Sequence, residues 1–346
     1  MIEIDGRTIG PGAKSFIIAE VAQAHDGSLG LAHSFIDAVA VHGADAVKFQ
    51  THIADAESTP AEPFRIPFSY EDNTRYEYWK RMEFTPEQWA GLADHCRQKQ
   101  IVFLSSVFSV EAIALLDRIG VPALKFGSGE VHNSTMLDAG IATGKPLLLS
   151  SGMSTYEELD DTVSFLRSKG AAFALFQATS KYPTPLTEVG LNNLDYLRTR
   201  YGVPTGLSDH SASIWPTITA IGRGADLVEF HVTFDRTMFG PDSIASLTFA
   251  ELAEIVSARD AIATMDSNPV DKSTMARDLG RMRQFFRKSV ALKEPQRAGT
   301  RLEAWMLTGK KPASGIPFDD VDKLVGRVLL RDVEATRLLT WDDVGQ

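Results

Sequence analysis

The stretch Asp45-Ala46-Val47-Lys48-Phe49-Gln50 carries the pattern that decides the fold: a short apolar run, typical of a buried strand, that ends in polar side chains. Seven similar runs occur along the chain, and amphipathic helical stretches separate them. These seven runs are residues 15–20, 101–106, 123–126, 146–151, 173–179, 205–209 and 226–232. Eight strands that alternate with helices predict an α/β protein whose parallel sheet closes into a (β/α)8 barrel, the TIM barrel.

Each of the eight runs becomes polar at or just past its carboxyl end. In a barrel these ends surround one mouth, where the active site of this fold lies. Among the polar residues at these strand ends, Ser and Thr are explained by ordinary polar loops. Such loops do not explain Lys48, Lys125, His210 and His231, because a charged group inside a strand needs a partner. We therefore predict a functional site at this mouth.

The chain is long enough for a second, smaller domain beyond the barrel. The alternating pattern fades near its last third, so we predict the barrel over residues 1–264, a polar linker over 265–287 and a small, loop-rich, mostly β domain over 288–346. Within the barrel, residues 52–84 form an insertion longer than an ordinary loop. We expect this insertion to be a lid over the mouth.

The composition is that of an ordinary globular chain of 346 residues, 44% hydrophobic and 23% charged. A formal net charge of −10, from 35 basic and 45 acidic residues, argues against broad binding to nucleic acid or anionic lipid. Cys96 is the one cysteine, which excludes an internal disulfide and fits a reducing compartment. The first apolar stretch, interrupted at Glu20, is too short for a signal peptide or a membrane span. We expect a cytoplasmic protein with no membrane partner.

Two histidines stand where adjacent strands end. His210 closes the seventh run, and His231 shares one face of the eighth with Glu229, because strand side chains two residues apart point the same way. Two imidazoles so placed can hold one divalent cation and leave positions open for water and substrate. The alternative is that each is a satisfied core or surface residue. His25, after the first strand, stays a further candidate, and Glu229 is expected to support the site rather than bind the ion.

Lys48 and Lys125 both interrupt apolar strand patterns. A buried ammonium group is unfavourable unless an anion meets it, which favours a phosphate or carboxylate ligand. Two alternatives stay open: an internal ion pair with Glu20 or Glu130, and a lysine that forms a Schiff base with its substrate. The residues alone therefore lead to a metal-assisted barrel enzyme that acts on an anion.

Seven short motifs follow one another along the chain. They are FIIAE (16–20), GADAVKFQ (43–50), KFGSGE (125–130), SGM (151–153), YPTP (182–185), GLSDH (206–210) and GPD (240–242). In this order they resemble the sialic acid synthase family, of the N-acetylneuraminate synthase type, and residues 287–342 resemble its appended antifreeze-like (SAF) domain. Members condense phosphoenolpyruvate with an N-acetylhexosamine-type aldose, which gives a nine-carbon 2-keto sugar acid and phosphate.

The resemblance implies a role for each matching residue. Phosphoenolpyruvate would be held by Lys48, Ser106, Lys125, Ser128, Ser150 and Ser208, and the amino sugar by Gln50, Glu130, Tyr182, Asp242 and Lys311. The catalytic residues would be Glu20, His210 and His231. The two histidines would bind a divalent metal that polarises the aldehyde, with Mn²⁺ expected and Mg²⁺ or Co²⁺ as alternatives. Glu20 would position or deprotonate the water that adds at C2.

The chain departs from the family at several positions near the sugar. Ala24-His25-Asp26-Gly27 replaces the usual Asn-His-Asn-Gly, Ser180 stands where many members have Asn, and Ser243 where His is common. Lys311 replaces an arginine that reaches the neighbouring subunit's sugar, and lysine offers no bidentate fork. We expect a modified or nonstandard hexosamine as the acceptor.

Because the family's tail caps the neighbouring barrel, the resemblance also implies a domain-swapped homodimer. Two rival functions stay open. One is a Schiff-base aldolase through Lys125 or Lys48, and the other is a carbohydrate-binding protein that kept the fold without turnover.

Overall fold

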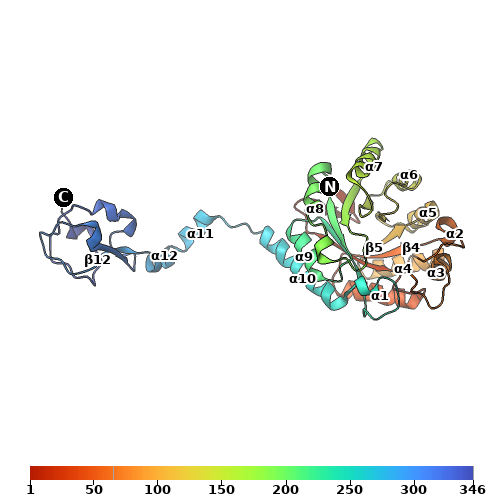
Figure 1. Cartoon of the computed structure of the whole chain (residues 1–346), viewed down its shortest axis with the longest axis horizontal. Coiled ribbons are helices and arrows are strands. Elements are labelled where there is room, and N and C mark those ends of the chain that lie inside the picture. Colours follow the sequence, from red (N-terminus) through yellow and green to blue (C-terminus); the bar gives the residue numbers. More distant parts are fainter. Residues whose placement is uncertain (65, 346) are drawn as a thin grey trace. The chain divides into compact units, whose positions relative to one another are not determined.

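The computed structural model of the chain describes residues 1–64 and 66–345. Arg65, in the predicted insertion, and Gln346, at the end of the predicted tail, lie outside the described residues. The chain divides into two compact units, Met1–Ser267 and Asn268–Gln346 (Figure 1). Each unit has its own hydrophobic core.

Eight parallel strands form a closed ring in the first unit. They are Phe16–Ala22 (β3), Ala46–Thr51 (β4), Val102–Val107 (β5), Leu124–Phe126 (β6), Leu147–Ser150 (β7), Phe173–Ala178 (β8), Thr205–Asp209 (β9) and Leu227–Thr233 (β10). Strands that are successive in the sequence pair with one another, and β10 also pairs with β3, which closes the ring. Each predicted run corresponds to one strand, so the predicted (β/α)8 barrel is confirmed.

Helices surround the strands (Figure 1). The main ones are Leu29–Val41 (α1), Pro86–Gln98 (α4), Val110–Ile119 (α5), Ser134–Ala142 (α6), Tyr156–Ser168 (α7), Asn192–Tyr201 (α8), Ile214–Gly222 (α9) and Phe249–Asp266 (α10). Side-chain oxygens of Ser, Thr or Asn cap the amino ends of most of them, for example Thr248 at α10. Among the helices of residues 1–64 and 66–345, none combines the length and apolarity needed to cross a membrane.

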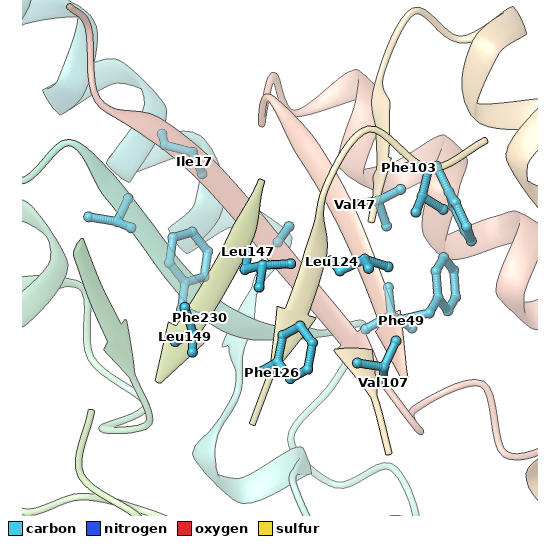
Figure 2. Packing of buried hydrophobic residues seen from close by; sticks show 14 of the residues in the cluster. Ile17, Val47, Phe49, Phe103, Val107, Leu124, Phe126, Leu147, Leu149 and Phe230 are labelled. Atoms are coloured by element: carbon cyan, nitrogen blue, oxygen red, sulfur yellow. The ribbon is translucent and has the colours of Figure 1, made fainter. Parts of the chain in front are cut away.

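The alternation of side chains along the strands positions the site. Outward residues such as Val47, Leu124 and Phe230 pack in the cluster between strands and helices (Figure 2). Inward residues near the amino ends of the strands, among them Ile18 and Ala46, form a separate apolar cluster. The next inward positions along the strands are polar and buried: Glu20, Lys48, Ser106, Lys125, Ser150, Ser208, Glu229 and His231. The barrel interior is therefore apolar at one end and polar at the other.

A hairpin that the sequence patterns did not predict precedes the barrel. Ile2–Ile4 (β1) pairs antiparallel with Arg7–Ile9 (β2). The side chains of Ile2, Ile4 and Ile9 belong to the apolar interior cluster of the barrel. The hairpin thus closes the amino end of the ring and leaves the polar carboxyl end for a site.

The insertion after β4 contains two helices, Ala54–Glu57 (α2) and Arg75–Met82 (α3). Its aromatic side chains form a cluster of their own, which includes Tyr78 and Trp79. Arg81 on α3 ion-pairs with Asp26, in the loop after β3. The insertion is thus anchored to the mouth of the barrel.

The second unit is small and rich in loops. Two short helices, Lys272–Asp278 (α11) and Gly280–Phe286 (α12), come first, and Ser289–Leu292 (β12) then pairs antiparallel with Leu307–Lys310 (β13). The remaining short elements of the chain are Leu247–Thr248 (β11) and the 3-10 helices Leu186–Glu188 (η1), Ser243–Ala245 (η2), Ala304–Met306 (η3), Phe318–Lys323 (η4) and Trp341–Asp343 (η5). The small β-rich tail expected from the sequence is confirmed, and its two strands are antiparallel.

One ion pair between a buried arginine and a partly buried aspartate fastens the last helix of the barrel to its strands. Asp45, just before β4, accepts hydrogen bonds from the Ile17 backbone N–H at 2.8 Å and from Arg259 on α10 at 2.5 Å. The Arg259 side chain is only 4% exposed. Removing one partner of a buried pair leaves the other charge uncompensated, which is more damaging than the loss of an exposed pair.

We expect Asp45→Ala to lower the free energy of unfolding by about 2 kcal/mol, because it removes the acceptor of the Ile17 backbone N–H and leaves the buried Arg259 with Asp260 as its carboxylate partner. Urea denaturation at neutral pH measures this change. Lys169→Met, which breaks an ion pair between half-exposed partners, is the control and should shift the value by less than about 1 kcal/mol. Equal losses in the two variants would contradict the assignment of Asp45 as a buried anchor.

Candidate active site

A cavity of about 750 Å³ opens at the polar end of the barrel. Residues of the strands, of the loops after them and of the insertion line its walls. The predicted site residues on these walls are Glu20, Lys48, Gln50, Ser106, Lys125, Ser128, Glu130, Ser150, Tyr182, Ser208, His210, His231 and Asp242. Lys311 belongs to the second unit, within which its ammonium group lies 4.8 Å from the centre of the Phe286 ring.

The two lysines share one glutamate. The Lys48 Nζ lies 3.6 Å from one carboxylate oxygen of Glu229, and the Lys125 Nζ lies 3.5 Å from the other. Lys48 also ion-pairs with Glu20 and donates a hydrogen bond to Ser106 at 2.8 Å. The internal pairing considered for Lys48 is therefore present.

Lys125 is arranged differently. It donates a hydrogen bond to the Ser150 hydroxyl at 2.5 Å, and its ammonium group lies 5.3 Å from the centre of the Phe176 ring. Glu130, the other partner considered for these lysines, instead accepts a hydrogen bond from Asn133 at 3.0 Å. Lys125 thus has a single carboxylate within ion-pairing distance among the described residues.

Burial and charge act in opposite directions on these four groups. Burial would raise the pKa of Glu229, but Lys125 and Lys48 outweigh it and hold the pKa well below its usual range. Burial raises the pKa of Glu20 to about 7 in spite of Lys48. Burial also lowers the pKa of Lys125, whereas the two carboxylates beside Lys48 overcome burial and raise its pKa. Glu229 is thus a fixed negative charge, and Glu20 can gain or lose a proton near neutral pH.

The two histidines face each other across the same cavity, with ring centres 5.5 Å apart. His210 Nδ1 lies 3.0 Å from the Thr179 carbonyl, so this nitrogen carries the hydrogen and Nε2 keeps its lone pair. Nε2 lies 3.0 Å from the Tyr182 hydroxyl, whose ring stacks on the imidazole. Burial lowers the pKa of His210 to about 4 and that of His231 to about 3.

Both imidazoles are therefore neutral at pH 7, the form in which histidine binds metals. This pair could hold a divalent cation and leave positions open for water and substrate. Within the described ranges 1–64 and 66–345, no three His, Cys, Asp or Glu side chains form a group with a metal-binding arrangement.

His25 was a further candidate, and the structure places it outside the residues that line the cavity. Its ring packs against Phe84 and Phe49 and is fully buried. Its Nδ1 accepts a hydrogen bond from the Gly27 backbone N–H at 3.2 Å. Burial lowers the pKa of His25 to about 3. His25, which stayed a candidate, is a neutral core residue outside the cavity walls in this structure.

The structure shows which of the residues that depart from the family pattern lie at the cavity. Ala24, Asp26 and Ser243 do not line the cavity, and Asp26 uses its charge in the ion pair with Arg81. Ser180 does line it. Residues 24 and 26 therefore do not contribute the change of the acceptor pocket that we expected from them.

Gln23, a buried residue that lines the cavity, was not predicted from the sequence. Its Oε1 has no hydrogen-bond partner among the described residues. Strict alternation after Glu20 does not predict this position, because the register shifts between Glu20 and Ala22, and Ala22 adopts a positive φ of 50°. Gln23 supplies a carboxamide one residue before the position where the family usually has Asn.

The insertion forms an apolar wall of the cavity. The sequence pattern did not predict which of its residues line the cavity. They are Phe64, Ile66, Phe68, Tyr78 and Trp79, together with Arg75. The Arg75 guanidinium lies 5.0 Å from the centre of the Trp79 ring and donates a hydrogen bond to Glu62. The segment expected to be a lid is thus a wall that combines aromatic rings with one cation.

Fold and site together define a parallel α/β barrel whose mouth carries two buried lysines and two neutral histidines. The NeuB family model matches residues 35–270, and the SAF domain model matches residues 287–345. The chain therefore belongs to the NeuB family and carries a SAF domain, which confirms the resemblance seen in its motifs.

Relatives of established name cover almost the whole chain. It is 31% identical to the N,N'-diacetyllegionaminic acid synthase of Legionella pneumophila, over 95% of this chain and 94% of that protein. It is 30% identical to the human N-acetylneuraminate-9-phosphate synthase, over 95% of this chain and 92% of that protein. A crystal structure of the sialic acid synthetase of Leptospira borgpetersenii serovar Hardjo-bovis, in complex with citrate, matches with a TM-score of 0.71 at 29% identity, over 82% of this chain and 95% of that one.

The burial of neutral His25 predicts a pH effect on stability. In the folded chain its pKa is about 3, whereas the unfolded chain takes up a proton near pH 6.5. Below pH 6.5 the unfolded state therefore binds one more proton than the folded state, and stability falls as the pH falls towards 3. His25→Phe should remove this contribution of about 1.4 kcal/mol per pH unit. Urea denaturation of both proteins between about pH 5 and 7 measures the two slopes, and parallel slopes would contradict the prediction.

Proposed function

We propose that this protein condenses phosphoenolpyruvate with the open-chain aldehyde of an N-acylated amino sugar. The products are a nine-carbon 2-keto sugar acid and inorganic phosphate. The observation that carries the proposal is the contact between the two halves of the site: Ser208 Oγ lies 2.9 Å from Glu229, between the lysines, and 3.5 Å from His210 Nε2. Membership of the NeuB family supports the same reaction.

The lysine half suits an anion. Lys48 and Lys125 place two buried ammonium groups on the two oxygens of Glu229, and the same two cations would pair with the phosphate and carboxylate of the ester. Hydroxyl groups surround the lysines as further hydrogen-bond partners, from Ser106, Ser128, Ser150 and Ser208. We assign these six side chains to phosphoenolpyruvate.

The histidine half suits a divalent metal, because both imidazoles are neutral and Nε2 of His210 has a lone pair, which a bound ion would take over from the Tyr182 hydroxyl. We assign His210 and His231 as the ligands, with Mn²⁺ as the proposed ion and Mg²⁺ or Co²⁺ as alternatives. When bound, the ion would polarise the aldehyde carbonyl for attack. Tyr182, which stacks on His210, would then contact the sugar beside it.

Glu20 is the proposed proton carrier. The reaction joins C3 of phosphoenolpyruvate to the aldehyde carbon, water adds at C2, and the C2–O bond to phosphate breaks. The water oxygen becomes the keto oxygen at C2 and gives up both of its protons, one of which ends on the former aldehyde oxygen and the other on the leaving phosphate. A carboxyl group with a pKa of about 7 can accept a proton from the water at neutral pH and release it again for one of these oxygens. Lys48, paired with Glu20, holds the carboxylate in place.

The amino sugar is assigned to the remaining wall, with Gln50, Glu130 and Asp242 as polar partners. The large apolar surface of the insertion, the Ser180 departure and the unpaired Gln23 carbonyl make this wall unlike a purely polar sugar site. We propose a modified, less hydroxylated hexosamine as the acceptor rather than plain N-acetylmannosamine.

With phosphoenolpyruvate, Mn²⁺ and a panel of amino sugars, we expect phosphate release together with a product that is positive in the thiobarbituric acid assay. Lys125→Met should abolish phosphate release, because the anion loses one of two buried cations. Lys145→Met removes a lysine that pairs with Asp117 outside the cavity and should keep normal activity.

Three outcomes would contradict this scheme. Borohydride trapping of substrate on a lysine, together with activity in a chelator, would show a Schiff-base aldolase. Sugar binding without phosphate release would show a carbohydrate-binding protein. A clear preference for N-acetylmannosamine would overturn the acceptor assignment and leave the reaction class intact.

We also propose a domain-swapped homodimer in which Lys311 of one subunit contacts the sugar in the other. Lys311→Met and Glu20→Gln should each be nearly inactive. Mixed after subunit exchange, they should recover about a quarter of normal activity, because half of the dimers are mixed and each has one complete site. No recovery in a verified mixed dimer would show that the tail does not act on its neighbour.

A further inference from the structure

His52 lines the cavity but has no part in the proposed reaction. It directly follows β4, and its ring is stacked between two others. The Trp79 ring of α3 lies 3.7 Å away at an interplanar angle of 10°, and the Phe108 ring, after β5, lies 4.2 Å away at 11°. A ring held on both faces cannot tilt, so the directions of its two nitrogens are fixed.

Both nitrogens face oxygen atoms in the plane of the ring. Nδ1 lies 2.6 Å from a carboxylate oxygen of Glu57 on α2, and Nε2 lies 3.3 Å from the side-chain oxygen of Gln50 on β4. An amide oxygen only accepts hydrogen bonds, so Nε2 donates to Gln50 in this arrangement. With its oxygen turned to His52, the Gln50 carboxamide has its NH₂ group left for other partners.

Burial makes this chain of contacts unlike an incidental surface cluster. His52 is 5% exposed, and the Glu57 side chain is 7% exposed. Within the described part of the chain, the second oxygen of the Glu57 carboxylate is buried without a hydrogen-bond partner. A buried carboxylate with one partner is unfavourable for stability. Such local losses are expected where a group serves a functional neighbour.

We propose that Glu57 and His52 are positioning residues that fix the Gln50 carboxamide with its NH₂ group towards the acceptor sugar. The group recognised there is a hydrogen-bond acceptor, such as an acyl carbonyl or hydroxyl oxygen. This inference rests on the proposed function, because it takes the sugar to occupy the wall that Gln50 lines. It makes the insertion, through α2 and Trp79, a determinant of acceptor recognition.

A double-mutant cycle between His52 and Gln50 tests the proposal. His52→Phe keeps the stack of rings and removes both ring nitrogens. We expect it to raise the KM for the sugar about tenfold, the effect of losing one well-oriented hydrogen bond, with the KM for phosphoenolpyruvate unchanged. In a Gln50→Ala background the same substitution should have no further effect, since His52 acts through Gln50. Gln50→Glu, which can still accept from His52 but has no NH₂ group, should behave like Gln50→Ala.

Two further variants complete the design. Glu57→Gln weakens the acceptor for Nδ1 and should raise the sugar KM in the same direction. If His52→Phe does not fold, the cycle is run with Glu57→Gln in its place. Asp55→Asn is the matched control: Asp55 lies on the same helix, is 68% exposed and pairs with Lys80, so this variant should have normal kinetics.

The outcomes separate the two proposals. If the unmodified protein turns over no sugar, the proposed function fails, and the positioning role fails with it. If it is active and His52→Phe has a normal sugar KM, or has the same effect with and without Gln50, the positioning role is wrong and the function stands. Equal rises in the KM for both substrates would show general damage to the site and would also overturn the positioning role.

Discussion

Two ammonium groups buried inside the barrel must be compensated, and the architecture of the mouth depends on this constraint. Glu229 compensates both, with Lys48 and Lys125 at 3.6 and 3.5 Å from its two oxygens. Because this carboxylate stays ionised, it fixes the charge of the cluster. Glu20 is left as the group that can change its charge near neutral pH. Fixed cations and one adjustable carboxyl group are what chemistry on an anionic ester requires.

The polar layer depends on the apolar layer beneath it. Charged groups inside a ring of strands lower stability, whereas the inward side chains at the amino ends, including Ile18 and Ala46, pack tightly with one another. The hairpin adds Ile2, Ile4 and Ile9 to that cluster and so seals the end opposite the site. One end of the barrel thus supplies cohesion, and the other carries function.

Features that depend on strand periodicity are well predicted from the sequence. All eight strands were predicted, and alternation by two residues correctly directs Lys48, Lys125 and His231 into the barrel. Features that break the period escape prediction. The hairpin strands are three residues long, too short for a pattern. Gln23 comes after a register shift, which the alternation of strand residues does not predict. His25 stayed a candidate because the sequence pattern does not show that the folded chain buries its ring against Phe84.

The two substrates of the proposed reaction are assigned to different parts of the fold, one to the strands and the other mostly to the loops. Lys48, Lys125, Ser208 and Glu229 lie on strands, whose positions the hydrogen-bonded ring fixes, so the chemistry of the anion can persist at about 30% identity to the named relatives. The groups assigned to the sugar lie mostly outside the strands, in loops and in the insertion with Trp79. Loops can change without disturbing the barrel. Family membership therefore predicts the reaction better than the sugar, and the aromatic wall of this chain is where we expect the proposed acceptor to be selected.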